Sequence, residues 1–188
     1  MTSDQRNQKT TLRTRFRAAR RTAEPAPLSS EALSAVGAFG VVAGQTVCAY
    51  LAIGGEPGSL ALLDALRSGG YRVLLPIVVG DAALDWALYD GALRAGPFGL
   101  REPAGEPLGA SAIGSAALVL VPALAVDHRG VRLGQGGGHY DRSLPMATGP
   151  LVGLVRDEEF VPSLPAEPHD VRLNAVLTPG SGVIHLPL

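Results

Sequence analysis

The stretch of this sequence best suited to chemistry is a glycine-rich run that returns at once to reactive side chains. Residues 132–142 read Arg-Leu-Gly-Gln-Gly-Gly-Gly-His-Tyr-Asp-Arg. Glycines accept positive φ angles and can expose consecutive backbone N–H groups, which together form a concave anion-binding site. A helix that begins near Gly138 would add its free N–H groups and its dipole to that attraction. We therefore predict a phosphate-binding loop at residues 134–138, with a flexible surface loop as the alternative.

The loop matches neither of the two common nucleotide-binding motifs. A Walker loop requires a lysine followed by Ser or Thr, and Lys9 is the only lysine of the chain. The dinucleotide-binding fingerprint fails because His139 stands at its last glycine position. That fingerprint also needs an acidic residue at a strand end about twenty residues later, and none is found there. The sequence therefore predicts phosphate binding outside both classes.

A nucleoside triphosphate carries more negative charge than backbone N–H groups can offset, so cations or a metal should converge on the loop. Arg132 directly precedes the loop. Lys9 and Arg13, one helical turn apart, would join it if the N-terminal segment folds over the loop. Asp141 follows the loop and could hold Mg²⁺, which binds proteins through one or two carboxylates. The alternative for Asp141 is an acid in the first turn of a helix.

The elements that must position these residues alternate between helix and strand. Apolar residues at spacings of three and four predict a basic helix over about residues 9–21, with Leu12 and Phe16 on its apolar side. Apolar runs without polar alternation predict strands covered on both faces, as in a parallel sheet. The predicted strands span residues 46–53, 71–79, 84–89, 117–126, 151–155 and 175–178. A second helix is expected from Ser29 or Ser30 toward Phe39, and a further helix over 59–68. Residues 93–109 are expected to form a long connection.

Length and composition favour a single domain over residues 1–188. The chain of 188 residues is 46% hydrophobic and 18% charged, which suits one compact core. No apolar run approaches the roughly 18 residues of a membrane span, so a soluble protein without a membrane partner is expected. Cys48, the one cysteine, excludes an internal disulfide and suits a reducing compartment. Residues 1–21 are basic, but the remainder is acidic, so no nucleic-acid partner is expected.

These residues resemble those of 5-formyltetrahydrofolate cyclo-ligases, also called methenyltetrahydrofolate synthetases. The resemblance rests on Lys9 with Arg13, on the strand exit at residues 50–56, and on residues 133–142. Further matching positions follow in order: Leu75-Pro76, Phe98-Gly99, Glu102-Pro103, Val121-Pro122, Pro168-His169-Asp170 and Val176-Leu177-Thr178. The resemblance covers nearly the whole chain. It implies a single-domain α/β fold, a three-layer α/β/α sandwich around a mostly parallel sheet, in a cytoplasmic enzyme that is expected to be a monomer.

The resemblance also assigns roles to particular residues. ATP contacts fall on Lys9, Arg13, Arg132, Leu133, Gly134, Gln135, Gly136, Gly137, Gly138, His139 and Tyr140. Contacts to the folate substrate fall on Leu51, Glu56, Gly136, Gly138 and Tyr140. Asp141 and Asp170 correspond to magnesium-associated acids, and no residue is assigned as acid, base or nucleophile.

The implied reaction converts 5-formyltetrahydrofolate into 5,10-methenyltetrahydrofolate with ATP as co-substrate and Mg²⁺ as cofactor. Transfer of the γ-phosphoryl group to the formyl oxygen gives an iminium phosphate, and the neighbouring amine then closes the ring as phosphate departs. The protein chiefly positions the reactants and excludes water. Glu56 is expected to orient the formyl group or the pterin nitrogens, with an ordinary turn acid as the alternative.

Several residues depart from the family pattern or carry two interpretations. His139 stands where the family commonly has a tyrosine, and neutral imidazole could supply that hydrogen bond. We expect Cys48, Trp86 and His169 to be structural, and Asp127 to be either a turn-former or an acid that shapes the site. Three rival functions remain: a nucleotide- or folate-binding homologue without turnover, a nucleic-acid-binding protein, and a sugar-phosphate enzyme of similar architecture.

Overall fold

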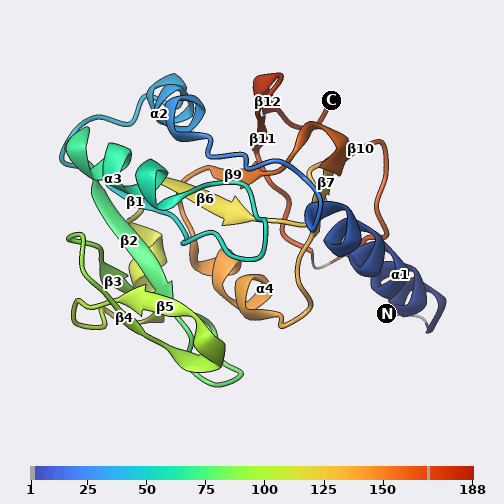
Figure 1. Cartoon of the computed structure of the whole chain (residues 1–188), viewed down its shortest axis with the longest axis horizontal. Coiled ribbons are helices and arrows are strands. Elements are labelled where there is room, and N and C mark those ends of the chain that lie inside the picture. The colour runs from blue at the N-terminus through green and yellow to red at the C-terminus, as the bar shows by residue number, and fades with distance from the viewer. Residues whose placement is uncertain (1–2, 169) are drawn as a thin grey trace.

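A seven-stranded mixed sheet forms the centre of the molecule in the computed structural model, which describes residues 3–168 and 170–188 (Figure 1). The strand order is β12-β11-β9-β6-β1-β2-β3, and the five inner strands run parallel. The edge strands β3 and β12 pair antiparallel with their neighbours. The strands of this sheet are β1 (Thr46–Cys48), β2 (Arg72–Ile77), β3 (Asp85–Leu88), β6 (Leu118–Pro122), β9 (Leu151–Leu154), β11 (Ala175–Thr178) and β12 (Gly182–His185).

Helices cover both faces of this sheet, which confirms the predicted three-layer α/β/α sandwich. One face packs against α2 (Ser29–Ala38) and α3 (Leu60–Ser68). The other face packs against η2 (Ala110–Ser115), α4 (His139–Ser143) and η3 (Leu144–Met146). Strand residues alternate between the two cores because successive side chains point to opposite faces; Val47 belongs to the first core and Cys48 to the second.

The first helix, α1 (Ser3–Arg20), lies to one side, away from α2 and α3 (Figure 1). It starts before the predicted helix at 9–21 and ends one residue sooner. Its apolar side packs on a small three-stranded sheet of β7 (Ala125–Asp127), β8 (Arg132–Leu133) and β10 (Phe160–Val161), where Phe16 meets Leu124 and Leu133. Because β8 leads into the glycine-rich loop, this packing brings the basic helix to that loop.

Three predicted segments differ from the structure. The predicted strand at 117–126 is two strands, because the chain leaves the central sheet after β6 and β7 pairs with β8 instead. The expected connection at 93–109 contains a hairpin of β4 (Leu93–Ala95) and β5 (Arg101–Pro103) around the short turn η1 (Pro97–Gly99). Strand β1 ends at Cys48, so the rest of the predicted strand, to residue 53, leaves the sheet.

Three residues whose roles the sequence left open have structural roles: Asp127, Cys48 and Trp86. The Asp127 carboxylate is fully buried and accepts hydrogen bonds from the backbone N–H groups of Arg129, Val131 and Leu164. Burial opposes its charge, but the Arg129 guanidinium and these N–H groups lower the pKa of Asp127 below its ordinary value. Asp127 is therefore a turn-former. Cys48 and Trp86 are buried in the second core, as predicted, and burial raises the pKa of the Cys48 thiol to about 12.

His169 lies outside the described residues, so its structural interpretation stays a prediction. In the described part of the chain, no helix combines the length and the apolar character needed to span a bilayer. The short turn η4 (Asp157–Glu159) completes the described elements.

Candidate active site

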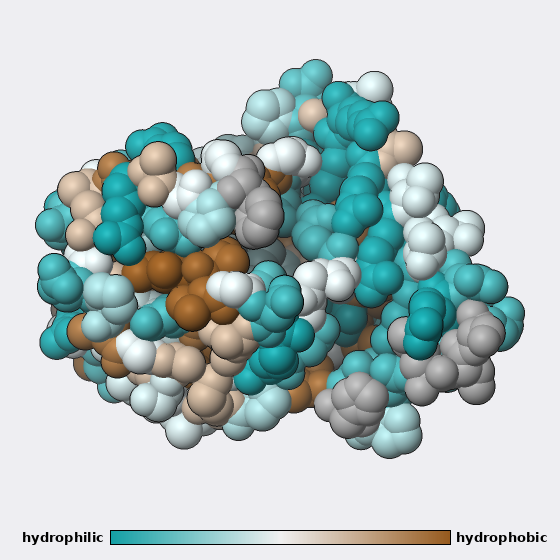
Figure 2. Space-filling model, turned by 90° about the horizontal axis from the view of Figure 1, so that it is seen from below, coloured by the Kyte–Doolittle hydropathy of each residue, from teal (hydrophilic) through white to brown (hydrophobic). Residues whose placement is uncertain are grey.

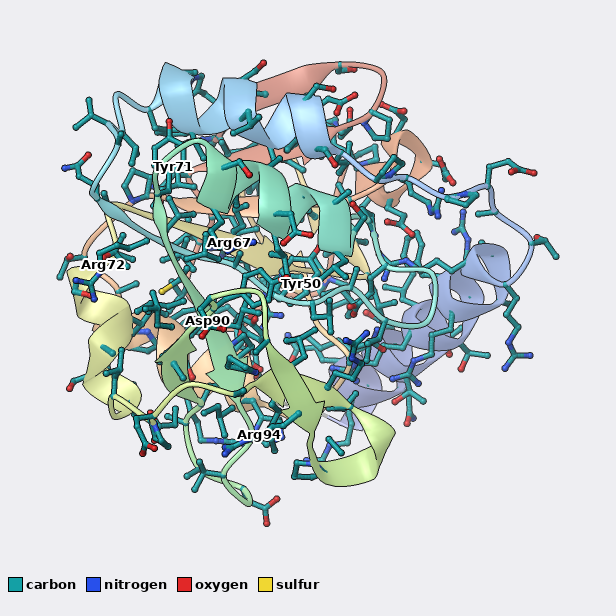
Figure 3. The ribbon with its side chains drawn as sticks, turned by 60° about the vertical axis from the view of Figure 1, so that its left-hand side comes forward. Tyr50, Arg67, Tyr71, Arg72, Asp90 and Arg94 are labelled. Atoms are coloured by element: carbon teal, nitrogen blue, oxygen red, sulfur yellow. The ribbon has the colours of Figure 1, made fainter. Side chains whose placement is uncertain are left out.

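A cavity of about 230 Å³ opens at the carboxyl ends of β1, β2 and β6. Strand β1 has its next strand, β2, on one side and β6 on the other, so the chain direction across the sheet reverses there. Open α/β sheets bind ligands at such a switch point. Tyr50, just after β1, lies near the centre of the molecule in Figure 3 and forms part of the lining. The fold therefore places the cavity where a ligand site is expected.

The cavity has two walls of different character. One wall is the glycine-rich loop at residues 134–138 with Arg132, and we call it the cationic wall. The other wall comes from the exits of β1 and β2 and from β5, and we call it the apolar wall. Its apolar members are Leu51, Ile53, Leu75, Pro76, Val78, Leu84 and Leu100. Seen from below, the surface is hollowed between a part with an apolar patch and a mainly hydrophilic part on the side of α1 (Figure 2).

The loop of the cationic wall presents unbonded backbone N–H groups. Gly136 and Gly138 have φ angles of 106° and 72°, which L side chains rarely adopt. No hydrogen bond within the described residues uses the N–H groups of Gly136, Gly137 or Gly138. Gly138 is the N-cap of α4, so a helix does begin where the sequence predicted one. The arrangement suits an anion, as predicted for residues 134–138.

Arginines from α1 and β8 surround this loop. Arg13 Nε donates to the Gly134 carbonyl oxygen at 3.0 Å, and Arg17 Nη2 donates to that of Gln135 at 2.6 Å. Arg132 pairs with Asp141, and its guanidinium lies 5.5 Å from the centroid of the Tyr140 ring. Burial, and next the nearby Arg17, lower the pKa of Arg13. The basic helix thus folds over the loop and gathers positive charge there, as anion binding requires.

Of the residues assigned to the site, four lie outside the lining of the cavity: Lys9, Arg13, Leu133 and Asp170. Lys9 Nζ is 3.4 Å from Asp170 Oδ2, and the same oxygen accepts the Glu167 N–H at 2.8 Å. Leu133 is buried against α1. Asp141 does line the cavity, and its side chain is 69% exposed. The structure therefore separates the two acids assigned to magnesium, and their roles stay predictions.

Glu56, after β1, and Tyr140, in α4, offer polar groups to a ligand where the two walls meet. Glu56 Oε1 accepts from Gln135 Nε2 at 3.2 Å, and Oε2 accepts from the Ile53 N–H at 3.2 Å. Burial raises the pKa of Glu56, and these hydrogen bonds counteract part of the rise. The Tyr140 hydroxyl is buried without a hydrogen-bond partner among the described residues, and burial raises its pKa. A buried hydroxyl of this kind is stabilised by a ligand that accepts a hydrogen bond from it.

Comparison with known proteins decides the family. A sequence model of the 5-formyltetrahydrofolate cyclo-ligase family matches residues 5–179. The chain belongs to this family. It is therefore a ligase of folate one-carbon metabolism.

Relatives and a solved structure agree with this assignment. The 5-formyltetrahydrofolate cyclo-ligase of Mycolicibacterium smegmatis is 52% identical over 153 residues, which are 77% of this chain and 79% of the relative. That of Escherichia coli K12 is 32% identical over 147 residues, covering 74% and 80% of the two chains. The NMR structure of Aquifex aeolicus 5,10-methenyltetrahydrofolate synthetase superposes with a TM-score of 0.78 at 26% identity, covering 95% of this chain and 92% of that one.

His139, which the resemblance sets against a tyrosine of the family pattern, has a defined place in the structure. It lines the cavity, and its Nδ1 lies 3.2 Å from the Ala82 carbonyl oxygen. With the proton on Nδ1, the imidazole donates to that carbonyl and fixes the turn between β2 and β3. This contact shows that His139 has a local structural partner, while its predicted ATP contact stays a prediction.

Sequence reasoning missed part of the lining of this cyclo-ligase cavity. Glu102, which had served only as a signpost of the resemblance, is 5% exposed and forms part of the wall. Leu84, Leu100 and Arg101 also line the cavity and had no assigned role. The Glu102-Pro103 pair could have indicated them, because it lies in a segment of 17 residues, 93–109, and connections of that length without secondary structure are uncommon and often functional.

Proposed function

We propose that this chain catalyses the ATP- and Mg²⁺-dependent cyclisation of 5-formyltetrahydrofolate to 5,10-methenyltetrahydrofolate, with release of ADP and phosphate. Family membership supports the overall conversion. The observation that carries the proposal is the single cavity with two unlike walls, one suited to phosphate and the other to a largely apolar heterocycle. A reaction that joins a nucleotide phosphate to a folate needs both kinds of surface beside each other.

The cationic wall binds the triphosphate of ATP. The backbone N–H groups of Gly136, Gly137 and Gly138 donate hydrogen bonds to the phosphate oxygens. Arg132 stabilises the negative charge of the transferring group, while Arg13 and Arg17 hold the loop in place and add positive potential.

The apolar wall holds the folate with its formyl group toward the loop. The γ-phosphoryl group passes to the formyl oxygen, so that the bond from phosphorus to the ADP oxygen breaks while N5 supplies the electron pair of the iminium. N10 then attacks the formyl carbon and loses its proton. Phosphate departs with the former formyl oxygen, which leaves the methenyl bridge. The Tyr140 hydroxyl donates a hydrogen bond to a folate oxygen, and Glu56 orients the formyl group.

Asp141 is the residue best placed for Mg²⁺. Its carboxylate is exposed at the cavity, and hard oxygen ligands of this type suit Mg²⁺, which completes its shell with waters and substrate phosphates. When bound, the ion supplies positive charge that stabilises the transferring phosphoryl group. Asp170 is proposed as a second magnesium-associated acid; its carboxylate contacts Lys9 and lies outside the cavity lining.

The test is an absorbance assay for methenyltetrahydrofolate, run with and without ATP and Mg²⁺ on the wild type and on Asp141→Asn. Asp64→Asn is the matched control, since Asp64 lies on α3 and bonds Tyr89 outside the cavity. We expect product only with ATP and Mg²⁺, and a loss of about 100-fold or more in Asp141→Asn alone.

Other outcomes favour the rival functions. A wild type that binds ATP and forms no product is a binding homologue without turnover. A wild type that fails to bind ATP points to a sugar-phosphate enzyme.

We also propose that the enzyme is a cytoplasmic monomer that acts without a nucleic-acid or membrane partner. Light scattering that gives the mass of two chains would contradict the monomer.

A further inference from the structure

The cavity contains a second glutamate, Glu102, whose carboxylate has no assigned role. It comes from β5 in the hairpin and is 5% exposed. Its Oε1 accepts the Val78 N–H at 2.9 Å. Within the described residues, Glu102 forms no ion pair. Among the described residues, the hydrogen-bond partner of this carboxylate is therefore one backbone N–H, that of Val78.

The packing of the hairpin fixes this side chain. Gly96 lies so close that a Cβ added there would be 2.6 Å from both Cγ and Cδ of Glu102. The Gly96 N–H donates to the Leu100 carbonyl oxygen at 2.8 Å, which closes the hairpin turn over the carboxylate. A side chain held in this way has little freedom to swing out to solvent. The position of the carboxylate is therefore built into the site.

A buried carboxylate is costly unless hydrogen-bond donors satisfy it. The Val78 N–H satisfies one oxygen, and the neighbouring wall residues Leu75, Pro76, Leu84 and Leu100 offer apolar side chains. The surroundings therefore favour a flat, mostly apolar ligand that brings its own donors. Two adjacent N–H groups on one edge of a heterocycle match the two oxygens of a carboxylate.

We propose that Glu102 is a specificity-determining residue that receives the donor edge of the folate pterin, formed by the ring N3–H and the exocyclic 2-amino group. This inference rests on the proposed function and adds the way in which the heterocycle is selected. It leaves Glu56, which contacts Gln135 of the loop, to the formyl end of the substrate. Each glutamate of the cavity then serves one end of the bicyclic ring.

The test combines Glu102→Gln with a substrate analogue in which a methyl group replaces the 2-amino group of 5-formyltetrahydrofolate. The glutamine keeps an oxygen for the Val78 N–H, so the backbone contact is preserved. We expect Glu102→Gln to raise the KM for 5-formyltetrahydrofolate by about 10- to 100-fold, with the KM for ATP unchanged. The analogue should raise the KM of the wild type by a similar factor and that of Glu102→Gln by far less. Glu106→Gln, an exposed change in the same segment, is the control.

If Glu102 were only structural, the analogue would raise the KM of the wild type and that of Glu102→Gln by the same factor. That result would overturn the inference. If Glu102→Gln does not fold, as judged by its thermal unfolding, the wild type alone decides: an unchanged KM for the analogue rejects the role. Failure of the proposed function is distinguishable, because the wild type would then form no product from 5-formyltetrahydrofolate itself.

Discussion

The two walls of the cavity are assembled by different means. The apolar wall comes largely from chain segments that leave neighbouring strands, so the sheet itself positions it. The cationic wall joins segments far apart in sequence, since Arg13 and Arg17 reach the loop across 121 and 118 residues. Polar contacts of α1 hold it, and few of them are buried. The positive charge that α1 contributes to the site therefore depends on how firmly this peripheral helix is attached.

The attachment of α1 gives the largest expected effect. Arg20 Nε lies 2.6 Å from Glu159 Oε1, and the two side chains are 2% and 1% exposed. Removal of one partner leaves a buried charge unpaired, so Arg20→Met should lower the free energy of unfolding by about 3–5 kcal/mol. Urea unfolding measures this loss. At temperatures where the variant stays folded, its KM for ATP should rise more than its KM for the folate.

Lys9→Met is the matched control on the same helix. The Lys9–Asp170 pair is longer, at 3.4 Å, and its side chains are 12% and 19% exposed. Pairs that retain contact with solvent contribute about 1 kcal/mol or less. Equal losses in the two variants would show that the buried pair does not anchor the helix.

The sequence predicted more of the cationic wall than of the apolar wall. The glycine-rich loop was found because glycine density and the sequel at His139 to Asp141 are local signals. The hairpin that carries Glu102 was predicted as a connection, since its two strands have three residues each and too few positions for a pattern. The sheet was predicted because buried parallel strands leave apolar runs. The sequence did not predict that Asp141 would line the cavity while Asp170 would not. That difference depends on the path of the loop that carries Asp170, and no local sequence pattern predicts this path.

The charge of the cationic wall is tested next at Arg132. Its side chain is 7% exposed beside the loop and pairs with Asp141. Removal of one preorganised charge from a phosphoryl-transfer site typically costs about 100- to 1,000-fold in rate, so Arg132→Ala should lower kcat/KM by that factor. Steady-state kinetics at saturating folate provide the measurement. Arg72→Ala is the control, because Arg72 is exposed at the amino end of β2, away from Tyr50 (Figure 3). If kcat/KM of Arg132→Ala stayed within threefold of the wild-type value, the cationic wall would have no part in catalysis.

The smallest expected effect concerns Glu56, where the two walls meet. Because burial raises its pKa above the ordinary 4.5, the folded protein binds this proton more tightly than the unfolded chain does. Stability should therefore fall as the pH rises from the ordinary carboxyl value through the raised one, and should change no further through this group above that window. Glu56→Gln removes this dependence, so the urea midpoint of the variant should rise relative to that of the wild type as the pH increases from the ordinary carboxyl value through the raised one. The exposed Glu106→Gln serves as control. Parallel profiles for Glu56→Gln and the wild type would mean that Glu56 is as well solvated in the folded protein as in the unfolded chain, and that the boundary between the walls is open to water.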